Sequence, residues 1–301
     1  ARIFPAPGCR PFPLQAPKGM HDILPGEQVW WDRVARVARE LADFYSFGKI
    51  DTPILEHAAV FERGVGGETD LIEKEMYMVK TKGGDALALR PENTAGVMRA
   101  YLEHHLGRGV QPKKFFYQGQ FFRHENPQAG RFRQFHQLGY EIIGGLNDPI
   151  YDAQVILVFQ RLLEELRLKN ILLKINSIGC RVCRPGYKRA LQNYYKPFEK
   201  KICSDCARRI KTNPLRLLDC KKEQCQEFKA KAPNFLDKLC ATCSQHLKSV
   251  LEYLEELGIS YQLDNQLVRG LEYYSRTVFE FFIEGTDVGA VGGGGRYDYL
   301  A

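Results

Sequence analysis

The stretch FFRHENPQAGRFRQFHQ, residues 121–137, predicts a β-hairpin, because two short β patterns flank a turn that contains Pro127 and Gly130. Three arginines, two histidines and four phenylalanines fall within it. A solvated surface hairpin does not need so many phenylalanines, and a hairpin buried in a core cannot hold so many charges. The stretch therefore predicts a sheet surface that binds a ligand.

Successive side chains of a strand point to opposite faces of a sheet, so each strand of this hairpin presents one row of residues to the ligand. We take the outgoing strand as residues 114–123 and the return strand as residues 131–143, and assume that the two rows share a face. The rows are Tyr117, Gly119, Phe121 and Arg123 on the outgoing strand, and Arg131, Arg133, Phe135, Gln137, Gly139 and Glu141 on the return strand.

These rows fit a polyphosphate and a nitrogen-rich small molecule. Guanidinium groups match phosphate oxygens, and the two glycines leave bare backbone on which a flat ring could lie, stacked against Phe132 or Phe135. Gln137 and Glu141 are suited to an amine or an imidazole. A surface salt-bridge ladder is the alternative, but Glu125 is the only acid within residues 121–137.

The composition is that of an ordinary globular protein. The chain has 301 residues, of which 44% are hydrophobic and 26% are charged. No apolar run approaches the roughly 20 residues that cross a bilayer, and residues 1–19 have no apolar stretch long enough for a signal peptide. We therefore expect a cytoplasmic protein with no membrane partner, in which disulfides are disfavoured. Residues 1–16 are expected to be a disordered tail.

Periodicity predicts an α+β architecture that is interrupted by a helical insertion. Helical patterns cover residues 30–44, 93–106 and 149–168, and β patterns cover residues 49–56, 74–90, 171–176 and 276–283. Between Cys180 and Cys243 the chain is instead cysteine-rich, basic and composed of short helical pieces. We therefore expect a core of residues 17–177 and 251–301 and an insertion of residues 178–250.

Positive charge is concentrated in the insertion. The formal net charge of the chain is +7, whereas residues 181–250 hold 17 Lys and Arg against 6 Asp and Glu. This confinement favours a module that contacts a polyanion. A merely basic, solvated surface is the alternative.

Eight of the nine cysteines form four closely spaced pairs in the insertion. The pairs are Cys180 and Cys183, Cys203 and Cys206, Cys220 and Cys225, and Cys240 and Cys243. Close spacing lets two thiolates bind one tetrahedral ion, so the pairs predict one or two structural Zn²⁺ sites with no open position for catalysis. Redox-active disulfides and unmetallated thiols are the alternatives, and the spacing does not say which pairs share an ion.

Several longer motifs resemble one known family. FRHENPQAGRFRQFHQLGYE (122–141) is similar to motif 2 of class II aminoacyl-tRNA synthetases, in the form found in histidyl-tRNA synthetases. LVRGLEYYSRTVFE (267–280) resembles the histidine-specific signature of that family, and LRPENTAGVMRA (89–100) resembles its amino-acid-binding segment. TNPLRLLDCK (212–221) looks like part of the bacterial-type insertion, and PKGMHDILPGE (17–27) and GGGGRYD (292–298) also match. The resemblance covers about residues 15–300 and implies the class II catalytic fold, an antiparallel sheet flanked by helices.

The resemblance also implies roles for individual residues. It implies that Arg123 holds the α-phosphate of ATP and that Arg269 is the catalytic arginine, close to that phosphate and to the carboxylate of histidine. Glu125 and Arg131 would lie in the loop that binds adenine and the distal phosphates, with Phe135 also in the ATP site. The implied histidine contacts are Glu92, Thr94, Gln137, Glu141, Tyr273, Tyr274 and Tyr297.

The implied activity is that of a histidine–tRNA ligase. Such an enzyme uses ATP with Mg²⁺ to convert L-histidine to histidyl-adenylate and then transfers the histidine to the 3′ end of tRNA(His). The basic insertion would contact the acceptor arm of the tRNA, and Pro53 would lie in motif 1, at a homodimer interface. Asn93 and Glu272 stand where the family usually has Gly and Asp.

The family's motif 3 and its C-terminal anticodon-binding domain are expected after Tyr297 and are absent from the sequence. We therefore expect a fragment of a longer chain, with weak or no aminoacylation by these 301 residues alone. Two alternatives come from other functional classes. One is a synthetase-like, histidine-binding regulatory subunit of ATP phosphoribosyltransferase, and the other is a zinc module that only binds nucleic acid.

Overall fold

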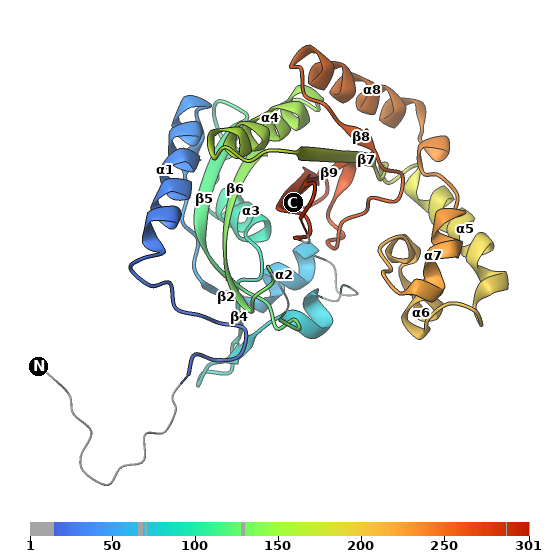
Figure 1. The fold of residues 1–301 in the computed structure, drawn as a ribbon, viewed down its shortest axis with the longest axis horizontal. Helices are drawn as coiled ribbons and strands as arrows, with labels where there is room; N and C mark the ends of the chain where they lie inside the picture. Colours follow the sequence, from blue (N-terminus) through green and yellow to red (C-terminus); the bar gives the residue numbers. More distant parts are fainter. Residues whose placement is uncertain (1–14, 66–68, 70, 128–129, 287, 301) are drawn as a thin grey trace, which may run out of the picture.

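The computed structural model describes residues 15–65, 69, 71–127, 130–286 and 288–300, and shows an α+β fold in which helices surround several small sheets (Figure 1). The tail expected at residues 1–16 lies almost wholly outside the described residues, as do residues 128–129 of the motif 2 loop. Within the described ranges, no helix has the length and the apolar character needed to cross a membrane.

A long antiparallel hairpin forms the centre of the fold. Strands β5 (Lys113–Phe122) and β6 (Gln134–Ile143) pair along their whole length, and the short strand β1 (Gly48–Lys49) joins β5 in parallel. Helices α1 (Gln28–Phe44) and α4 (Ile150–Glu165) cover one face, where Phe116 and Tyr140 are buried. Helix α3 (Thr94–Glu103) packs on the other face against Tyr117 and Phe121. The alternation expected for the motif 2 hairpin is confirmed, since its odd and even positions enter different hydrophobic clusters.

A second sheet has the order β10-β9-β7-β8. Its central strands β9 (Ser275–Ile283) and β7 (Ile171–Ser177) are antiparallel, with β10 (Gly292–Arg296) and β8 (Gln262–Leu263) at the edges. Helices α4 and α8 (Ala241–Glu256) pack on this sheet, and Ile156, Leu173, Val250 and Phe281 meet in their shared core. The sheet carries the histidine-specific signature, which ends in β9.

A third sheet differs from the arrangement that the sequence predicts. It contains β2 (Leu55–His57), β4 (Ala86–Leu89) and β3 (Met78–Lys80), next to α2 (Ala58–Val65) and the π-helical turn η1 (Leu71–Glu75). The β3–β4 hairpin is confirmed, with Gly84 at φ 95° in its turn. The single strand predicted at residues 49–56 is wrong, because β1 and β2 belong to different sheets. Pro53 lies between them and cannot donate the hydrogen bond that a continuous strand needs.

The insertion is helical, as predicted. It contains α5 (Arg184–Tyr195), α6 (Ser204–Thr212) and α7 (Glu223–Ala230), joined by the 3₁₀ turns η2 (Lys196–Phe198), η3 (Pro214–Leu217) and η4 (Leu236–Lys238). Figure 1 shows these helices beside the sheets as a group of their own. Their core is built from Tyr187, Leu191, Phe235 and the cysteines. The boundary expected at residue 250 falls inside α8, whose first turn belongs to the insertion core and whose later turns pack on α4.

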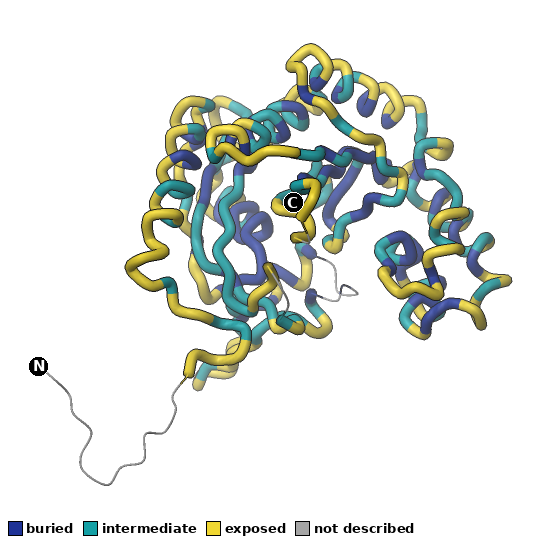
Figure 2. Tube along the Cα trace, in the orientation of Figure 1, coloured by how far each residue is buried: buried dark blue, intermediate teal, exposed yellow. Residues whose placement is uncertain are grey.

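Helix α1 is buried only in its middle. Val37, Ala38 and Ala42 are buried, whereas Trp30 and Phe44 at its two ends are 66% and 78% exposed. Figure 2 shows the exposed residues of α1 on the outside of the fold. The apolar residues of the helical pattern at residues 30–44 therefore extend beyond the part of α1 that the core covers.

Candidate active site and metal centres

The register of β5 and β6 places the two rows of motif 2 opposite each other. Tyr117 pairs with Gly139, Gly119 with Gln137, and Phe121 with Phe135. Directly opposed residues of an antiparallel pair share a face of the sheet. The assumption that the two rows lie on one side is therefore confirmed for the residues within the strands, whereas Arg123, Arg131 and Arg133 lie beyond the strand ends.

Glu141 lies at the inner end of this face and is buried. Its Oε1 accepts a hydrogen bond from Thr94 Oγ1 at 2.7 Å, and its Oε2 accepts one from the Tyr297 hydroxyl at 2.5 Å. Burial raises the pKa of Glu141 to about 7, although these donors act in the opposite direction. The group is therefore poised to change its protonation state near neutral pH.

Glu92 is a second buried carboxylate, and it sits at the N-terminus of α3. It accepts the backbone N–H groups of Thr94 and Ala95 at 2.7 and 3.0 Å, and the Tyr273 hydroxyl at 3.3 Å. These N–H groups have no partner within the helix, and a negative charge there also complements the helix dipole. Burial nevertheless raises the pKa of Glu92.

Aromatic rings enclose the two carboxylates. The ring centroid of Tyr273 lies 4.6 Å from that of Tyr274 and 6.0 Å from that of Tyr297. Gln137 Nε2 donates to the Tyr117 hydroxyl at 3.3 Å, and that hydroxyl also reaches Glu141 Oε1 at 3.4 Å. Tyr117 was not among the predicted histidine contacts, although its position in the outgoing row could have indicated it.

The glycine platform expected on the hairpin is wrong, because the protein itself fills both glycine positions. A Cβ atom on Gly139 would overlap the ring of Tyr117, and a Cβ atom on Gly119 would overlap the guanidinium of Arg90. Arg90 is buried there and donates to the carbonyl oxygens of Gln120 and Thr52, at 2.9 Å in each case. The glycines therefore admit two side chains of the chain and not a flat ligand ring.

Two arginines from different segments line the site: Arg123 directly follows β5, and Arg269 lies in the loop between β8 and β9. Arg123 donates from Nε to the Pro91 carbonyl at 2.9 Å, and its guanidinium carbon lies 5.1 Å from the centre of the Phe135 ring. Arg269 pairs with Glu280 on β9 and lies 5.7 Å from the centre of the Tyr274 ring. Glu280 was not predicted, because an acidic residue in an alternating strand pattern is typical of a solvent-facing position.

The loop residues predicted for ATP lie at the outer end of the hairpin. Arg131 and Glu125 form an ion pair at 3.5 Å, in which the side chain of Arg131 is 49% exposed. An exposed pair of this kind contributes little to stability. The Arg131 side chain is therefore available to a ligand at small energetic cost, whereas Glu125 is largely covered.

One cavity of about 1390 Å³ connects these groups. It lies between the hairpin and the second sheet, and the facing edge strands β6 and β10 both line it. All twelve residues predicted for histidine and ATP line this cavity: Glu92, Thr94, Arg123, Glu125, Arg131, Phe135, Gln137, Glu141, Arg269, Tyr273, Tyr274 and Tyr297. Lys221 of the insertion lines it as well. Along the hairpin, the cavity thus runs from the buried Glu141 at the inner end to Arg123 and Arg131 at the outer end.

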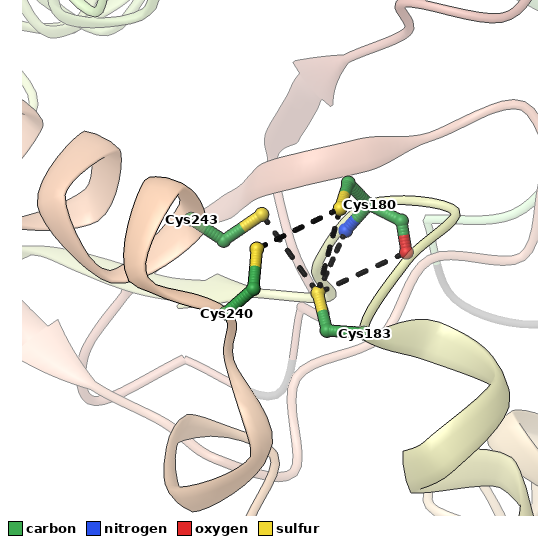
Figure 3. A group of neighbouring side chains, drawn as sticks. All are labelled: Cys180, Cys183, Cys240 and Cys243. Atoms are coloured by element: carbon green, nitrogen blue, oxygen red, sulfur yellow. Dashed lines mark hydrogen bonds between the residues drawn. The ribbon is translucent and has the colours of Figure 1, made fainter.

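The cysteines form two groups of four, and the structure supplies the pairing that spacing left open. Cys180 and Cys183 meet Cys240 and Cys243 (the first cysteine cluster, Figure 3), and the second cysteine cluster contains Cys203, Cys206, Cys220 and Cys225. The sulfur atoms within each cluster lie within 4.8 Å of one another, and all eight thiols are free.

The sulfur geometry fits a tetrahedral ion. Neighbouring sulfurs in the first cluster are 3.7, 3.8 and 3.9 Å apart, and Cys203 and Cys220 in the second cluster are 3.9 Å apart. Metal–sulfur bonds of about 2.3 Å in a tetrahedron separate the ligands by about 3.8 Å, whereas a disulfide needs about 2.05 Å. Each cluster could therefore hold a metal ion.

Helix N-termini also favour thiolates at these positions. Cys183 and Cys240 immediately precede α5 and α8, and Cys203 precedes α6. Burial alone would raise the pKa of Cys180, but the N–H groups of Cys183 and Val182 and the neighbouring thiols lower it to about 6. In contrast, burial and the neighbouring thiols raise the pKa of Cys243, Cys206 and Cys225.

An antiparallel motif 2 hairpin flanked by helices, with Glu141 on its ligand face and Arg123 at the end of β5, agrees with the catalytic fold of class II aminoacyl-tRNA synthetases. The family model described as histidyl-tRNA synthetase matches residues 19–301. The chain belongs to the histidyl-tRNA synthetase family.

Curated relatives agree with this family. The histidine–tRNA ligase of Desulforamulus reducens is 48% identical over 287 residues, which cover 94% of this chain and 68% of the relative. The histidine–tRNA ligase of Geobacter sulfurreducens is 46% identical over 285 residues, with the same coverage. This chain therefore spans about two thirds of the length of these relatives.

Solved structures show the same relationship. The apo histidyl-tRNA synthetase of S. aureus has a TM-score of 0.76 and 35% identity, and the match covers 95% of this chain and 67% of that one. A Bacillus halodurans protein described as an ATP phosphoribosyltransferase regulatory subunit/histidyl-tRNA synthetase has a TM-score of 0.70 and 24% identity, covering 97% and 78%. At this lower identity, the second likeness concerns the fold alone.

Proposed function

We propose that this protein is a histidine–tRNA ligase, which activates L-histidine with ATP to histidyl-adenylate and pyrophosphate and then transfers the histidine to the 3′ end of tRNA(His). One observation carries the proposal: two buried carboxylates, Glu92 and Glu141, stand beside the arginines Arg123 and Arg269 in a single cavity. A cationic or hydrogen-bonding amino acid fits the carboxylate end, and a polyphosphate fits the arginine end.

The carboxylate end selects histidine. Glu141 accepts a hydrogen bond from the imidazole ring, and Gln137 donates one to it. Glu92 and Thr94 hold the α-amino group. Tyr273, Tyr274 and Tyr297 close the pocket around the ring. A competitor without ring N–H groups cannot donate to the buried Glu141, and the loss of such a hydrogen bond to a charged group costs about 1.5–3 kcal/mol.

The arginine end aligns ATP for attack by the carboxylate of histidine on the α-phosphorus. Arg123, fixed by the Pro91 carbonyl and the Phe135 ring, holds the α-phosphate. Arg269, fixed by Glu280, neutralises charge on the same phosphate and on the attacking carboxylate. Glu125, Arg131 and Phe135 contact adenine and the distal phosphates, and Mg²⁺ travels with the ATP. Such reactions are accelerated mainly by alignment and charge neutralisation.

Each cysteine cluster holds one structural Zn²⁺. Four sulfur ligands per ion, at separations close to a tetrahedral edge, support zinc and leave no position open for chemistry. The insertion is small and rich in charge, and two ions give it a core that apolar side chains alone do not supply.

The insertion contacts the acceptor arm of tRNA(His), and two copies of the chain form a homodimer. The excess of positive charge in residues 181–250 supports the tRNA contact. The exposed apolar side chains Trp30, Phe44, Ile54 and Leu55, which lie on α1 and next to Pro53, support an interface at motif 1.

Histidine-dependent ATP–pyrophosphate exchange tests this function on the protein at its full natural length. We expect exchange with histidine and a loss of about 10²–10³ in rate for Arg269→Ala, because one electrostatic contact to the transition state disappears. Arg36→Ala, on the exposed side of α1, is the matched control and should retain the rate. Histidine binding without any exchange would instead identify a regulatory subunit.

A further inference from the structure

We propose that the first cysteine cluster and Arg184 together position Tyr273 and Tyr274, so that a metal ion bound by Cys180, Cys183, Cys240 and Cys243 controls the affinity for histidine. The proposal deepens the proposed function and rests on it, because it takes the two tyrosines as part of the histidine site. It makes Arg184 a positioning residue and gives this ion a role beyond the stability of the insertion.

Arg184 connects the cluster to the histidine-specific signature. It directly follows the ligand Cys183 and is the first residue of α5. Its Nη2 donates to the Tyr274 carbonyl at 2.5 Å and to the Gly179 carbonyl at 3.4 Å. Two or more bonds from one rigid guanidinium fix both the donor and the backbone that accepts them. The position of Cys183 therefore determines the position of the Tyr274 backbone.

The turn that precedes Cys180 is also hydrogen-bonded to β9, the strand that follows Tyr274. Gly179 has φ 60°, and a Cβ atom there would lie only 2.5 Å from Cys183 Sγ. The Gly179 carbonyl accepts the Arg276 N–H at 2.9 Å, and the Arg276 carbonyl accepts the Ile178 N–H at 2.7 Å. Only glycine allows the sulfur and the strand to approach this closely.

The side chains of Tyr273 and Tyr274 connect this backbone segment to the histidine site. The Tyr273 hydroxyl donates to Glu92 at 3.3 Å, and the Tyr274 ring lies beneath the Arg269 guanidinium. Loss of the metal ion would remove the bonds that hold the four sulfur atoms together, so that Cys183 would be free to move. That movement shifts Tyr274 through Arg184 and loosens the pocket.

The second cluster has a more remote connection. It reaches the signature through Asn213, whose side chain bonds Glu272 and which lies seven positions from both Cys206 and Cys220. We therefore expect the second cluster to affect histidine binding less than the first.

Equilibrium dialysis with labelled histidine, together with metal analysis, tests the linkage. Arg184→Ala should keep two metal ions per chain and bind histidine about tenfold more weakly, because a charged hydrogen bond is removed. Arg184→Lys should recover part of the affinity, and Arg189→Ala, an exposed arginine on the same helix, should match the wild type. Cys240→Ser should lose one ion and weaken histidine binding more than Cys220→Ser does.

Hydrogen exchange supplies a readout that does not depend on histidine. Amides in residues 271–279 should exchange faster in Arg184→Ala than in the wild type and Arg189→Ala. Unchanged exchange and unchanged histidine affinity in Arg184→Ala would overturn the linkage, even if the cysteine variants do not fold. Faster exchange in a protein whose wild type binds no histidine would overturn the proposed function instead.

Discussion

At the scale of single residues, Glu141 makes a prediction about pH. Its folded pKa of about 7 lies above the ordinary value of 4.5, so the folded state binds this proton more tightly than the unfolded state. The stabilisation is complete below the ordinary value and is lost as the pH rises through 7. Relative to Glu141→Gln, the wild type should lose roughly 2–3 kcal/mol of unfolding free energy between pH 5 and 8.

Urea denaturation of both proteins at several pH values measures this difference. Glu165→Gln, at the exposed end of α4, is the control and should follow the wild-type curve. Parallel curves for Glu141→Gln and the wild type would show that Glu141 ionises normally in the folded protein.

Glu280 makes a second prediction at this scale. Its carboxylate holds Arg269, so Glu280→Gln should slow histidine-dependent ATP–pyrophosphate exchange by about tenfold, less than Arg269→Ala does. Because both changes act on one guanidinium, the double variant should be no slower than Arg269→Ala alone. If the rate losses of the two single variants multiplied in the double variant, this coupling would be contradicted. Glu284→Gln, at an exposed position directly after β9, is the control.

The residues that long motifs assign to histidine and ATP come together in the structure, and their roles stay predictions, whereas contacts that depend on tertiary structure were missed. All twelve motif residues line one cavity. Tyr117 and Glu280 were missed because their partners are determined by strand register and by a loop, which local patterns do not encode. The glycine platform was wrong for a related reason: glycine indicates close approach, but not which group approaches.

At the scale of elements, Gly119 tests how tightly the motif 2 hairpin is packed. Gly119→Ala should lower the free energy of unfolding by about 1–3 kcal/mol, because the new methyl group displaces the buried guanidinium of Arg90 from its carbonyl partners. Denaturant unfolding measures the change.

The matched control is Gly186→Ala in α5, where a Cβ atom would meet no other atom within 4 Å. Alanine in a helix should be neutral or stabilise by up to about 1 kcal/mol. Equal effects at the two glycines would contradict the packing at Gly119.

Elements with a clear period were predictable, and connections between distant segments were not. The helix patterns and the two hairpins are confirmed, with ends displaced by a few residues. The strand at residues 49–56 failed because alternation does not reveal that a chain changes sheets at a proline. The cysteine partners were hidden because Cys183 and Cys240 come together only through the path of α5, α6 and α7.

At the scale of the whole molecule, the uneven charge makes a prediction about salt. Lys200 and Lys211 are exposed on the insertion, so the double variant Lys200→Ala with Lys211→Ala should weaken tRNA(His) binding at low salt. The slope of log K against log salt should become shallower by about one for each phosphate that a lysine no longer neutralises. Fluorescence anisotropy across a KCl series measures it, with Lys169→Ala outside the insertion as control. An unchanged slope would favour a merely solvated basic surface.

Helix α8 has a consequence for how this molecule can be cut or recombined. Cys240 is the residue at its N-cap, its first turn supplies Cys243, and its later turns bury Val250 and Leu254 against α4. A helix of 16 residues is about 24 Å long and rigid. The insertion and the catalytic core are therefore joined by one rigid helix and not by a flexible hinge. The insertion is therefore not an exchangeable cassette. Grafting it into a relative requires transplanting all of α8 together with the surface of α4 that receives it.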